Sequence, residues 1–400
     1  MFGKIAIIQY ILIQVFISWF TEYLLGKNKR LRSIAKKTRV PRCIMYGILA
    51  VIPVLGTFLG KSSFKYTCMA IGNIWLGFFM YYSAFILILS LILVLIPKVR
   101  KDPEKRAFGY VIFIATAITF ILCIYGYIHA QNPKTVTYDI AVEKTAEKDE
   151  TAGEKNGGDL KIVLIADLHL SVNSNTRSVE KWVDLVNSEN PDVIVIAGDI
   201  FTSNIEGLSN PDKYAEILRS MHAKYGVYAV CGNHDVDEDL FGGFAISPVS
   251  EAFKLKEMDE FYEKAGFTML YDESVEIADG QVTLVGRVDG EKAGDGTKNR
   301  MSPGELLKNV DKSKPVVVVE HEPKEFKELS AAGADVVLCG HTHNGQVFPG
   351  NLIVPFFNEN AYGLKELYGV KTIVTAGTGY YGPPMRIGTD SEVTVVNMSY

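Results

Sequence analysis

Side chains that could bind divalent cations occur in five short segments of the second half of the chain. These segments are Asp167-Leu-His169, Gly198-Asp199, Gly232-Asn233-His234-Asp235, His321 and Gly340-His341-Thr-His343. Five of the seven histidines of the chain fall within them. Four of the segments directly follow apolar runs typical of β-strands, namely Ile162–Ala166, Val193–Ala197, Val227–Val230 and Val336–Cys339. A sheet is therefore expected to fix these side chains at its strand ends.

The residue types favour two-metal phosphoester chemistry. A phosphoester is hydrolysed by in-line attack on phosphorus, and two cations about 3.5–4 Å apart can activate the nucleophile and absorb charge on the non-bridging oxygens. Asp199 is the natural bridging ligand, because a carboxylate oxygen can serve both ions and Gly198 lets the backbone approach closely. Asn233 adds a neutral amide oxygen. Oxygen and imidazole ligands without a thiolate favour two ions of Mn, Fe, Zn or Mg.

The spacing within two segments suggests a simple geometry. On an extended strand, side chains two residues apart lie on the same face, so Asp167 and His169 are expected to reach one ion, and His341 and His343 are expected to obey the same geometry. Each segment alone is a weak signal, because a lone histidine or a Gly-Asp turn is common in structural roles. Their combination, in order and at strand ends, indicates a metal site.

Charge is distributed unevenly along the chain. Residues 1–130 contain 16 Lys and Arg against 3 Asp and Glu, whereas residues 131–400 contain 25 against 43. An acidic second half argues against a nucleic-acid partner, whose phosphates would repel it. It is compatible with a site that collects cations.

The first 130 residues are predicted to form a transmembrane region of four helices. Four apolar stretches reach the length of about 20 residues that crosses about 30 Å of hydrocarbon. They are Ile5–Leu25, Val40–Leu59, Thr67–Ile96 and Ala107–Ala130. A buried core helix or a signal peptide would explain one such stretch but not four in succession. Membrane lipids are therefore expected to surround this region.

The basic residues of the loops predict the orientation. Eight lie in residues 27–42, between the first two stretches and at the start of the second, and five lie between the third and fourth, against two in the middle loop. By the positive-inside rule the first and third loops face the cytoplasm. The residues after 130 are then expected on the extracytoplasmic face.

Residues 131–158 are expected to be a polar linker, in which Thr135–Val142 is compatible with a strand and Glu143–Gly158 suggests a mobile tether. From residue 159 to residue 400, strand and helix patterns alternate, which predicts an α/β domain. Asp279-Gly280 marks a hairpin between Val275–Ile277 and Val282–Val285. The expected helices are Arg177–Glu189, Pro211–Met221, Glu251–Ala265 and Ser302–Val310, and further strands are expected at Val370–Thr375 and Glu392–Val396.

With these segments, residues 160–400 resemble the calcineurin-like metallophosphoesterase superfamily, and most closely its bacterial membrane-anchored branch. The run Gly340-His-Thr-His-Asn-Gly345-Gln346 and the tail Gly377-Thr-Gly379-Tyr-Tyr-Gly382-Pro-Pro-Met-Arg386 are similar to signatures of that branch. The resemblance implies an α/β sandwich of two mixed β-sheets flanked by helices. It also implies a binuclear, metal-dependent phosphoesterase.

The resemblance further implies a role for each residue of the site. One metal would be held by Asp167, His169, Asp199 and His343, and the other by Asp199, Asn233, His321 and His341. His234 matches a substrate-contacting histidine that stabilises the phosphoryl oxygens or protonates the leaving group.

Three further residues are predicted near the substrate or near His234. Asp235 would either orient His234 or cap the following turn. Asn344 stands where the branch usually has glycine, at the rim of the substrate site. Arg386 would contact a phosphate or form a salt bridge.

Three functional hypotheses remain. The first is a membrane-anchored hydrolase of phosphoester or pyrophosphate bonds, acting on a lipid-linked or envelope substrate. The second is a cytoplasm-facing hydrolase of a nucleoside-diphosphate-linked lipid of the UDP-diacylglucosamine type. The third is a membrane sensor that binds metal or phosphate without turnover. Retention of every metal ligand and of His234 favours an enzyme.

Overall fold

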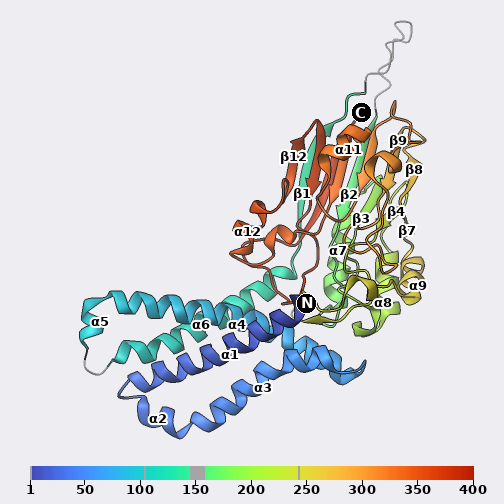
Figure 1. Cartoon of the computed structure of the whole chain (residues 1–400). Coiled ribbons are helices and arrows are strands. Elements are labelled where there is room, and N and C mark those ends of the chain that lie inside the picture. The colour runs from blue at the N-terminus through green and yellow to red at the C-terminus, as the bar shows by residue number, and fades with distance from the viewer. Residues whose placement is uncertain (1, 103–104, 145–157, 242–243) are drawn as a thin grey trace, which may run out of the picture. The chain divides into compact units, whose positions relative to one another are not determined.

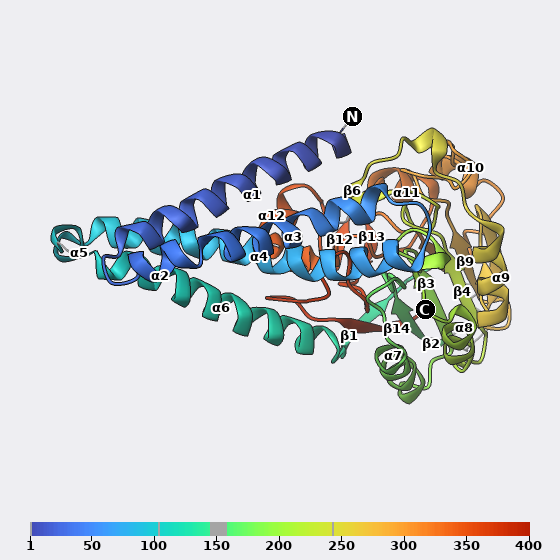
Figure 2. The same ribbon diagram turned by 90° about the horizontal axis from the view of Figure 1, so that it is seen from below.

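The computed structural model describes residues 2–102, 105–144, 158–241 and 244–400, which form two compact units. The first unit contains the chain up to Ile128, together with the described parts of the short segments 239–247 and 382–385. The second unit contains the rest of the chain from His129 onward. Figures 1 and 2 show the elements of both units from two directions.

Helices build the first unit. They are α1 (Phe2–Lys27), α2 (Arg32–Lys37), α3 (Arg39–Phe58), α4 (Ser63–Leu95), α5 (Pro97–Lys101) and α6 (Arg106–Ala130), and a short hairpin of β5 (Leu240–Phe241) and β6 (Phe244–Ala245) belongs to the same unit. Four of the helices, α1, α3, α4 and α6, are long and apolar enough to cross a membrane, as the sequence predicts. Many of their large apolar side chains are exposed, which suits a lipid environment rather than water.

Two six-stranded mixed sheets form the centre of the second unit, which confirms the predicted fold class. The first sheet has the order β1-β14-β2-β3-β4-β7 and the second the order β12-β13-β11-β10-β9-β8. Their strands are β1 (Lys134–Ala141), β2 (Asp159–Ile165), β3 (Val193–Ala197), β4 (Val227–Val230), β7 (Thr268–Met269), β8 (Glu273–Ile277), β9 (Val282–Gly286), β10 (Val316–Val319), β11 (Val336–Cys339), β12 (Gly363–Leu367), β13 (Val370–Val374) and β14 (Glu392–Ser399).

Helices flank the two sheets. They are α7 (Thr176–Ser188), α8 (Pro211–Arg219), α9 (Lys256–Ala265), α10 (Pro303–Leu306), α11 (Phe326–Ala332) and α12 (Gly350–Ile353), with 3-10 turns η1 (Ile205–Gly207), η2 (Val249–Glu251), η3 (His343–Gly345) and η4 (Val354–Phe356). The four predicted helices are present as α7 to α10. However, α9 begins only at Lys256, and α10 ends at Leu306 after the capping box that Ser302 and Glu305 form.

Side-chain alternation along the strands creates separate cores. In β2, Ile162 and Leu164 belong to a core shared by both sheets, while Val163 and Ile165 belong to a core that includes side chains of α7, α8 and α9. A third core joins the other face of the second sheet to α11. Figure 2 shows α7 and α8 beside the first sheet and α11 beside β13. Both faces of each sheet are thus covered, as expected for strands that are almost continuously apolar.

The strand that the sequence suggests at Thr135–Val142 is present as β1, so the first sheet begins within the residues expected to form the linker. Strand β1 pairs in parallel with β14 from Lys134, opposite Glu392, to Ala141, opposite Ser399. Only three residues, 131–133, separate α6 from β1. Of the mobile tether that the sequence suggests, residues 145–157 lie outside the described residues.

Candidate metal centre

The predicted ligands meet at one end of the two sheets. Strands β2, β3 and β4 are parallel neighbours, as are β10 and β11, so the carboxyl ends within each set lie at one edge of a sheet. The ligands follow these ends: Asp167 and His169 after β2, Asp199 after β3, Asn233 after β4, His321 after β10, and His341 and His343 after β11. The fold therefore gathers seven residues that are spread over 177 positions of sequence.

The ligand residues do not continue their strands, which corrects the predicted strand geometry. Asp167, His169, Asp199, His341 and His343 all have positive φ, between 45° and 74°. Such left-handed backbone is uncommon outside glycine, costs about 1–3 kcal/mol per residue, and gathers at functional sites. Backbone hydrogen bonds hold it, since Asp167 N–H donates to Gly198 O (3.0 Å) and His169 N–H to Asp199 O (3.0 Å).

Glycine is required where the ligand-bearing turns approach each other. A Cβ atom on Gly198, where φ is 80°, would lie 2.8 Å from the backbone of Gly232 and from Nδ1 of His321. A Cβ atom on Gly340 would lie 2.6 Å from Oδ2 of Asp167. The glycines of the sequence motifs thus let the turns pack closely enough for their side chains to converge.

Donor atoms of a first cluster surround one point. Nε2 of His169 lies 3.0 Å from Nε2 of His343. Nε2 of His343 in turn lies 3.4 Å from Oδ1 of Asp167. Oδ2 of Asp199 is 3.6 Å from Nε2 of His169. All four side chains are buried. Ligands that each lie about 2.0–2.2 Å from one ion have separations of this size, so the cluster fits a divalent cation.

A second cluster shares Asp199 with the first. Oδ2 of Asp199 lies 3.1 Å from Nε2 of His321, and Nδ1 of His341 lies 3.2 Å from that same nitrogen. Nδ1 of His341 is also 3.2 Å from Oδ1 of Asn233. His341 and His343 therefore belong to different clusters, whereas strand geometry would have placed both on one ion. These distances are compatible with the division of ligands that the family resemblance implies, and the ion that each residue holds stays a prediction.

Electrostatics prepares these donors for a cation. Burial lowers the pKa of His169 and of His341 to about 3, which keeps both imidazoles neutral with a free lone pair. Burial raises the pKa of Asp167 to about 7, and the nearby Asp199 adds to that rise. Although burial opposes it, His321 holds the pKa of Asp199 well below its usual range. His321 itself donates from Nδ1 to Ala197 O (2.8 Å), which directs Nε2 toward Asp199.

His234 is oriented by a carboxylate that the sequence analysis did not identify. Its backbone N–H donates to Oδ1 of Asp199 (2.8 Å), and its Nδ1 lies 3.0 Å from Oε1 of Glu238. Nζ of the buried Lys292 donates to the other carboxylate oxygen of Glu238 (2.6 Å). This chain of contacts fixes Nδ1 of His234 and leaves Nε2 for a substrate.

Asp235 has neither of its two predicted roles. Its carboxylate accepts hydrogen bonds from the backbone N–H groups of Phe201 (2.8 Å), Gly232 (2.8 Å) and Ile200 (3.2 Å). It therefore ties the turn after β3 to the turn after β4, instead of touching the His234 ring or capping the turn that follows.

Arg386 also departs from its prediction. The side chain is fully buried and donates to the carbonyls of Ala376 (2.7 Å), Gly377 (3.1 Å) and Gly379 (2.7 Å). Its guanidinium thus holds together the loop before β14 and is not presented to a phosphate. Asn344 is partly exposed beside His343, so its place at the rim of the substrate site stays a prediction.

Tyr381 is a further residue that sequence reasoning missed. Its ring centroid lies 4.5 Å from that of His234 and 4.9 Å from that of His169. Its hydroxyl is buried and has no hydrogen-bond partner among the described residues. The only sequence signal was its position in the Gly-Tyr-Tyr-Gly tail. Glu238 follows His234 by four residues, but nothing in the sequence linked the distant Lys292 to either.

Comparisons with known proteins agree with this geometry. The sequence model of the calcineurin-like phosphoesterase family matches residues 160–345. A zebrafish protein named transmembrane protein with metallophosphoesterase domain is 32% identical over 296 residues, which is 70% of this chain and 61% of that protein. An uncharacterized metallophosphoesterase of Aquifex aeolicus is 33% identical over 264 residues, covering 66% of this chain and 93% of its own length.

A third relative, an uncharacterized metallophosphoesterase of Campylobacter jejuni, is 29% identical over 243 residues, or 60% of this chain and 59% of that protein. The match thus spans about three-fifths of the zebrafish and Campylobacter proteins but nearly all of the Aquifex protein. Of these three alignments, the Aquifex one relates this chain to almost a whole protein.

Proposed function

The chain belongs to the family of calcineurin-like phosphoesterases, and from that premise we propose that it hydrolyses phosphoester or pyrophosphate bonds with the help of two divalent cations. The proposed substrate is a lipid-linked or envelope molecule. The observation that carries the proposal is the pair of ligand clusters that share one oxygen, Oδ2 of Asp199, with His234 beside them.

In this proposal four side chains, those of Asp199, His234, Glu238 and Tyr381, act together with two bound cations. When bound, two divalent cations would neutralise charge on the phosphoryl oxygens and lower the pKa of an attacking water. Asp199 holds the two ligand clusters in fixed relation. His234 offers its Nε2 proton to the leaving oxygen, while Glu238 keeps its Nδ1 proton in place. The hydroxyl of Tyr381 can donate to a phosphoryl oxygen, which would satisfy its unpaired group.

The membrane setting supports a lipid-linked substrate. Four helices are long enough to cross a bilayer, and the zebrafish relative is named as a transmembrane protein. The excess of basic residues in the first and third loops favours an extracytoplasmic position for the metal centre. That orientation favours an envelope substrate over a nucleoside-diphosphate-linked lipid, which is the substrate of the cytoplasm-facing alternative.

A substrate comparison tests the activity. The full chain, purified in detergent and loaded with Mn²⁺, should release product from p-nitrophenyl phosphate, bis-p-nitrophenyl phosphate or inorganic pyrophosphate. The pattern of cleavage would distinguish a monoesterase, a diesterase and a pyrophosphatase. Asp199→Asn, prepared in the same way, serves as the inactive control. Equal rates for the two proteins would show that the activity comes from a contaminant, and the proposal would fail.

Orientation needs a separate measurement. Ser209 is exposed, so Ser209→Cys on a background without the five native cysteines should react with a membrane-impermeant maleimide in intact cells. Labelling that appears only after lysis would reverse the proposed orientation. It would also favour the cytoplasmic nucleoside-diphosphate lipid as the substrate.

A further inference from the structure

The connection from β11 to β12 carries an unusual group of exposed apolar side chains. Five of the ten large apolar side chains that are exposed in the described part of residues 131–400 lie between Phe348 and Phe357. Phe356 and Phe357 are 85% and 79% exposed. Residues 346–358 contain no charged side chain. A contiguous apolar segment of this kind marks a surface for a protein or membrane partner.

This connection leaves the same end of the sheets that carries the metal ligands. Cys339, the last residue of β11, pairs with Val374 of β13. Val374 also pairs with Gly363, the first residue of β12. Residues 340–362 therefore begin and end at the ligand end of the second sheet. Figure 1 shows α12 toward the end of the second unit opposite the C-terminus.

The chain from the last apolar helix enters the first sheet at this same end. Lys134, the first residue of β1, pairs with Glu392, the first residue of β14. Two residues further along β14, Thr394 pairs with Leu164, which lies just before the metal ligand Asp167. Residues 131–133 can span at most about 10 Å, so the ligand end of the domain stays close to the end of α6.

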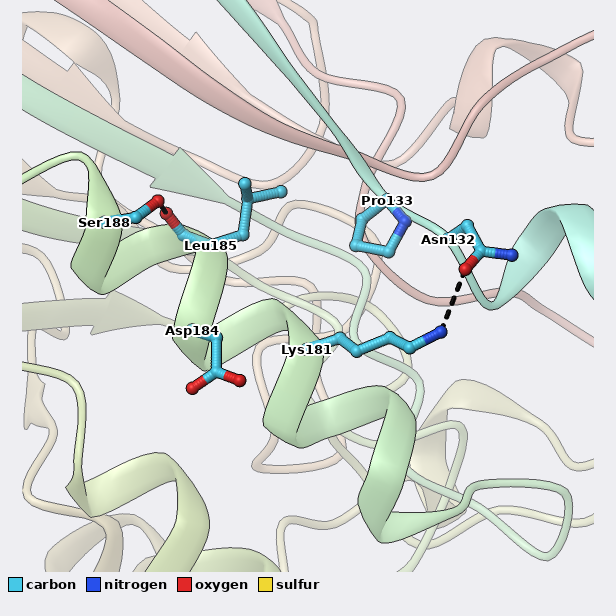
Figure 3. Close-up of a pocket in the computed structure, with 6 residues that line it drawn as sticks. All are labelled: Asn132, Pro133, Lys181, Asp184, Leu185 and Ser188. Carbon is cyan, nitrogen blue, oxygen red and sulfur yellow. Dashed lines mark hydrogen bonds between the residues drawn. The ribbon is translucent and has the colours of Figure 1, made fainter.

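Hydrogen bonds keep this junction fixed on the second unit. Nζ of Lys181, in α7, donates to Oδ1 of Asn132 (2.9 Å) and to the carbonyl of Gln131 (3.0 Å). Nδ2 of Asn175 donates to Oε1 of Gln131 (2.9 Å), and Oγ of Ser391 to the carbonyl of Ala130 (2.9 Å). Figure 3 shows Lys181 reaching Asn132 beside the pocket that these segments line. These bonds hold residues 130–132 on the second unit, beside the start of β14.

We propose that residues 346–358 are a membrane-docking segment, which inserts Phe356 and Phe357 into the surface of the bilayer that holds the four apolar helices. The inference rests on the proposed placement of those helices in a membrane and not on the phosphoesterase activity. Short apolar segments with aromatic side chains bind at the boundary between headgroups and acyl chains. Docking there would hold the metal centre at the level of lipid headgroups, where a lipid-linked phosphoester is found.

Photocrosslinking to lipid tests the proposal. The full chain would be reconstituted in nanodiscs of phosphatidylcholine and phosphatidylglycerol that carry an alkyne-tagged acyl chain. Phe357→p-benzoylphenylalanine should form a lipid adduct in several-fold higher yield than Tyr368→p-benzoylphenylalanine. Tyr368 is a matched control, because it is also aromatic and is 54% exposed. It lies in the turn between β12 and β13, at the end of the second sheet opposite the metal ligands.

Leu12→p-benzoylphenylalanine provides the reference for membrane insertion, because Leu12 is an exposed residue of α1. Adducts at 12 and 357 but not at 368 would support docking. Adducts at 12 with equal yields at 357 and 368 would overturn it. A product of twice the chain mass from position 357 would assign the segment to a second copy of the chain. Absence of adducts at position 12 would remove the bilayer placement on which the inference rests. None of these readouts depends on turnover.

Discussion

The candidate metal centre and a neighbouring arginine cluster are two polar sites that differ in their balance of charge. The arginine cluster consists of the buried Arg287 and Glu320, the partly buried Arg300 and the exposed Glu325, and Glu320 directly precedes the predicted metal ligand His321. Nη1 of Arg287 lies 3.0 Å from Oε2 of Glu320 and 2.8 Å from Oε2 of Glu325. Nη1 of Arg300 is 3.3 Å from the same oxygen of Glu320.

The difference indicates which of the two clusters is suited to bind a cation. In the arginine cluster, two guanidinium groups face two carboxylates, so the charges compensate each other. In the metal centre, the carboxylates of Asp167 and Asp199 face imidazoles, of which His169 and His341 are held neutral by burial. Despite its burial, His321 has a pKa raised well above its usual value by Asp199, so it compensates part of this charge. A bound cation would stabilise the neutral lone pairs that remain.

The largest expected effect comes from removing the shared ligand. Asp199→Asn takes away the anionic oxygen common to both clusters, so turnover should fall by about 10³-fold or more, because metal ions supply several kcal/mol of transition-state stabilisation. Steady-state hydrolysis of p-nitrophenyl phosphate measures the loss. The exposed His222 offers a control, since His222→Ala should keep wild-type turnover. Substantial activity in Asp199→Asn would contradict the assignment.

The next effect concerns the proton donor beside the metals. His234→Ala should retain bound metal but lower kcat by about 10²–10⁴-fold, the usual range for general acid–base catalysis. Esters with leaving groups of low pKa should lose less, because they need no proton. Glu238→Gln should show the same dependence on the leaving group with a smaller loss, since Glu238 acts only by positioning His234. Equal losses for good and poor leaving groups would argue against the acid role.

The arginine cluster should give the opposite pattern, a loss of stability without a loss of chemistry. Arg287→Met leaves the buried Glu320 without its closest positive partner, which should cost about 3–5 kcal/mol. At about 2–4 °C per kcal/mol for a domain of this size, the apparent melting temperature of the full chain should fall by roughly 10 °C.

Turnover per folded molecule of Arg287→Met should stay at the wild-type level. Arg219→Met, at an exposed position of α8, should change stability by no more than about 0.5 kcal/mol. A specific loss of kcat in Arg287→Met would show that the arginine cluster contributes to the reaction.

The smallest effect is the pH dependence of metal binding. Burial raises the pKa of Asp167 to about 7 in the metal-free site, so below that pH a cation must displace a proton to bind. The affinity for Mn²⁺ should therefore fall at least about tenfold per pH unit on acidification below about pH 7, with proton release on binding. Calorimetric titrations in buffers of different ionisation enthalpy measure both quantities. An affinity that does not change between about pH 5 and about pH 8 would contradict this prediction.

The sequence predicted the parts of this molecule that local patterns encode. The apolar runs before Asp167, Asp199, Asn233 and His341 form the strands β2, β3, β4 and β11, and the four apolar stretches form helices. Strand β1 was less clear, because its exposed residues gave it the composition of a linker. Its pairing with β14, more than 250 residues later, supplies the stability that its own sequence does not show.

Contacts between distant segments could not be predicted. Asp235 was expected to orient His234 or to cap the following turn, and Arg386 was expected to contact a phosphate or to form a salt bridge. In the folded chain both bind backbone groups of neighbouring turns, and Glu238 with Lys292 supports His234 instead. The left-handed backbone at the ligands likewise depends on the closure of several turns onto one point, which no local pattern specifies.

The metal content of three proteins tests the central claim most directly. After equilibrium dialysis of the full chain against Mn²⁺, plasma emission should find two ions per chain in the wild type. Asp199→Asn should bind fewer than two, because both clusters lose their shared oxygen, whereas Arg287→Met should still bind two. A wild type that binds no more than one ion, or an Asp199→Asn variant that still binds two, would contradict a binuclear centre bridged by Asp199.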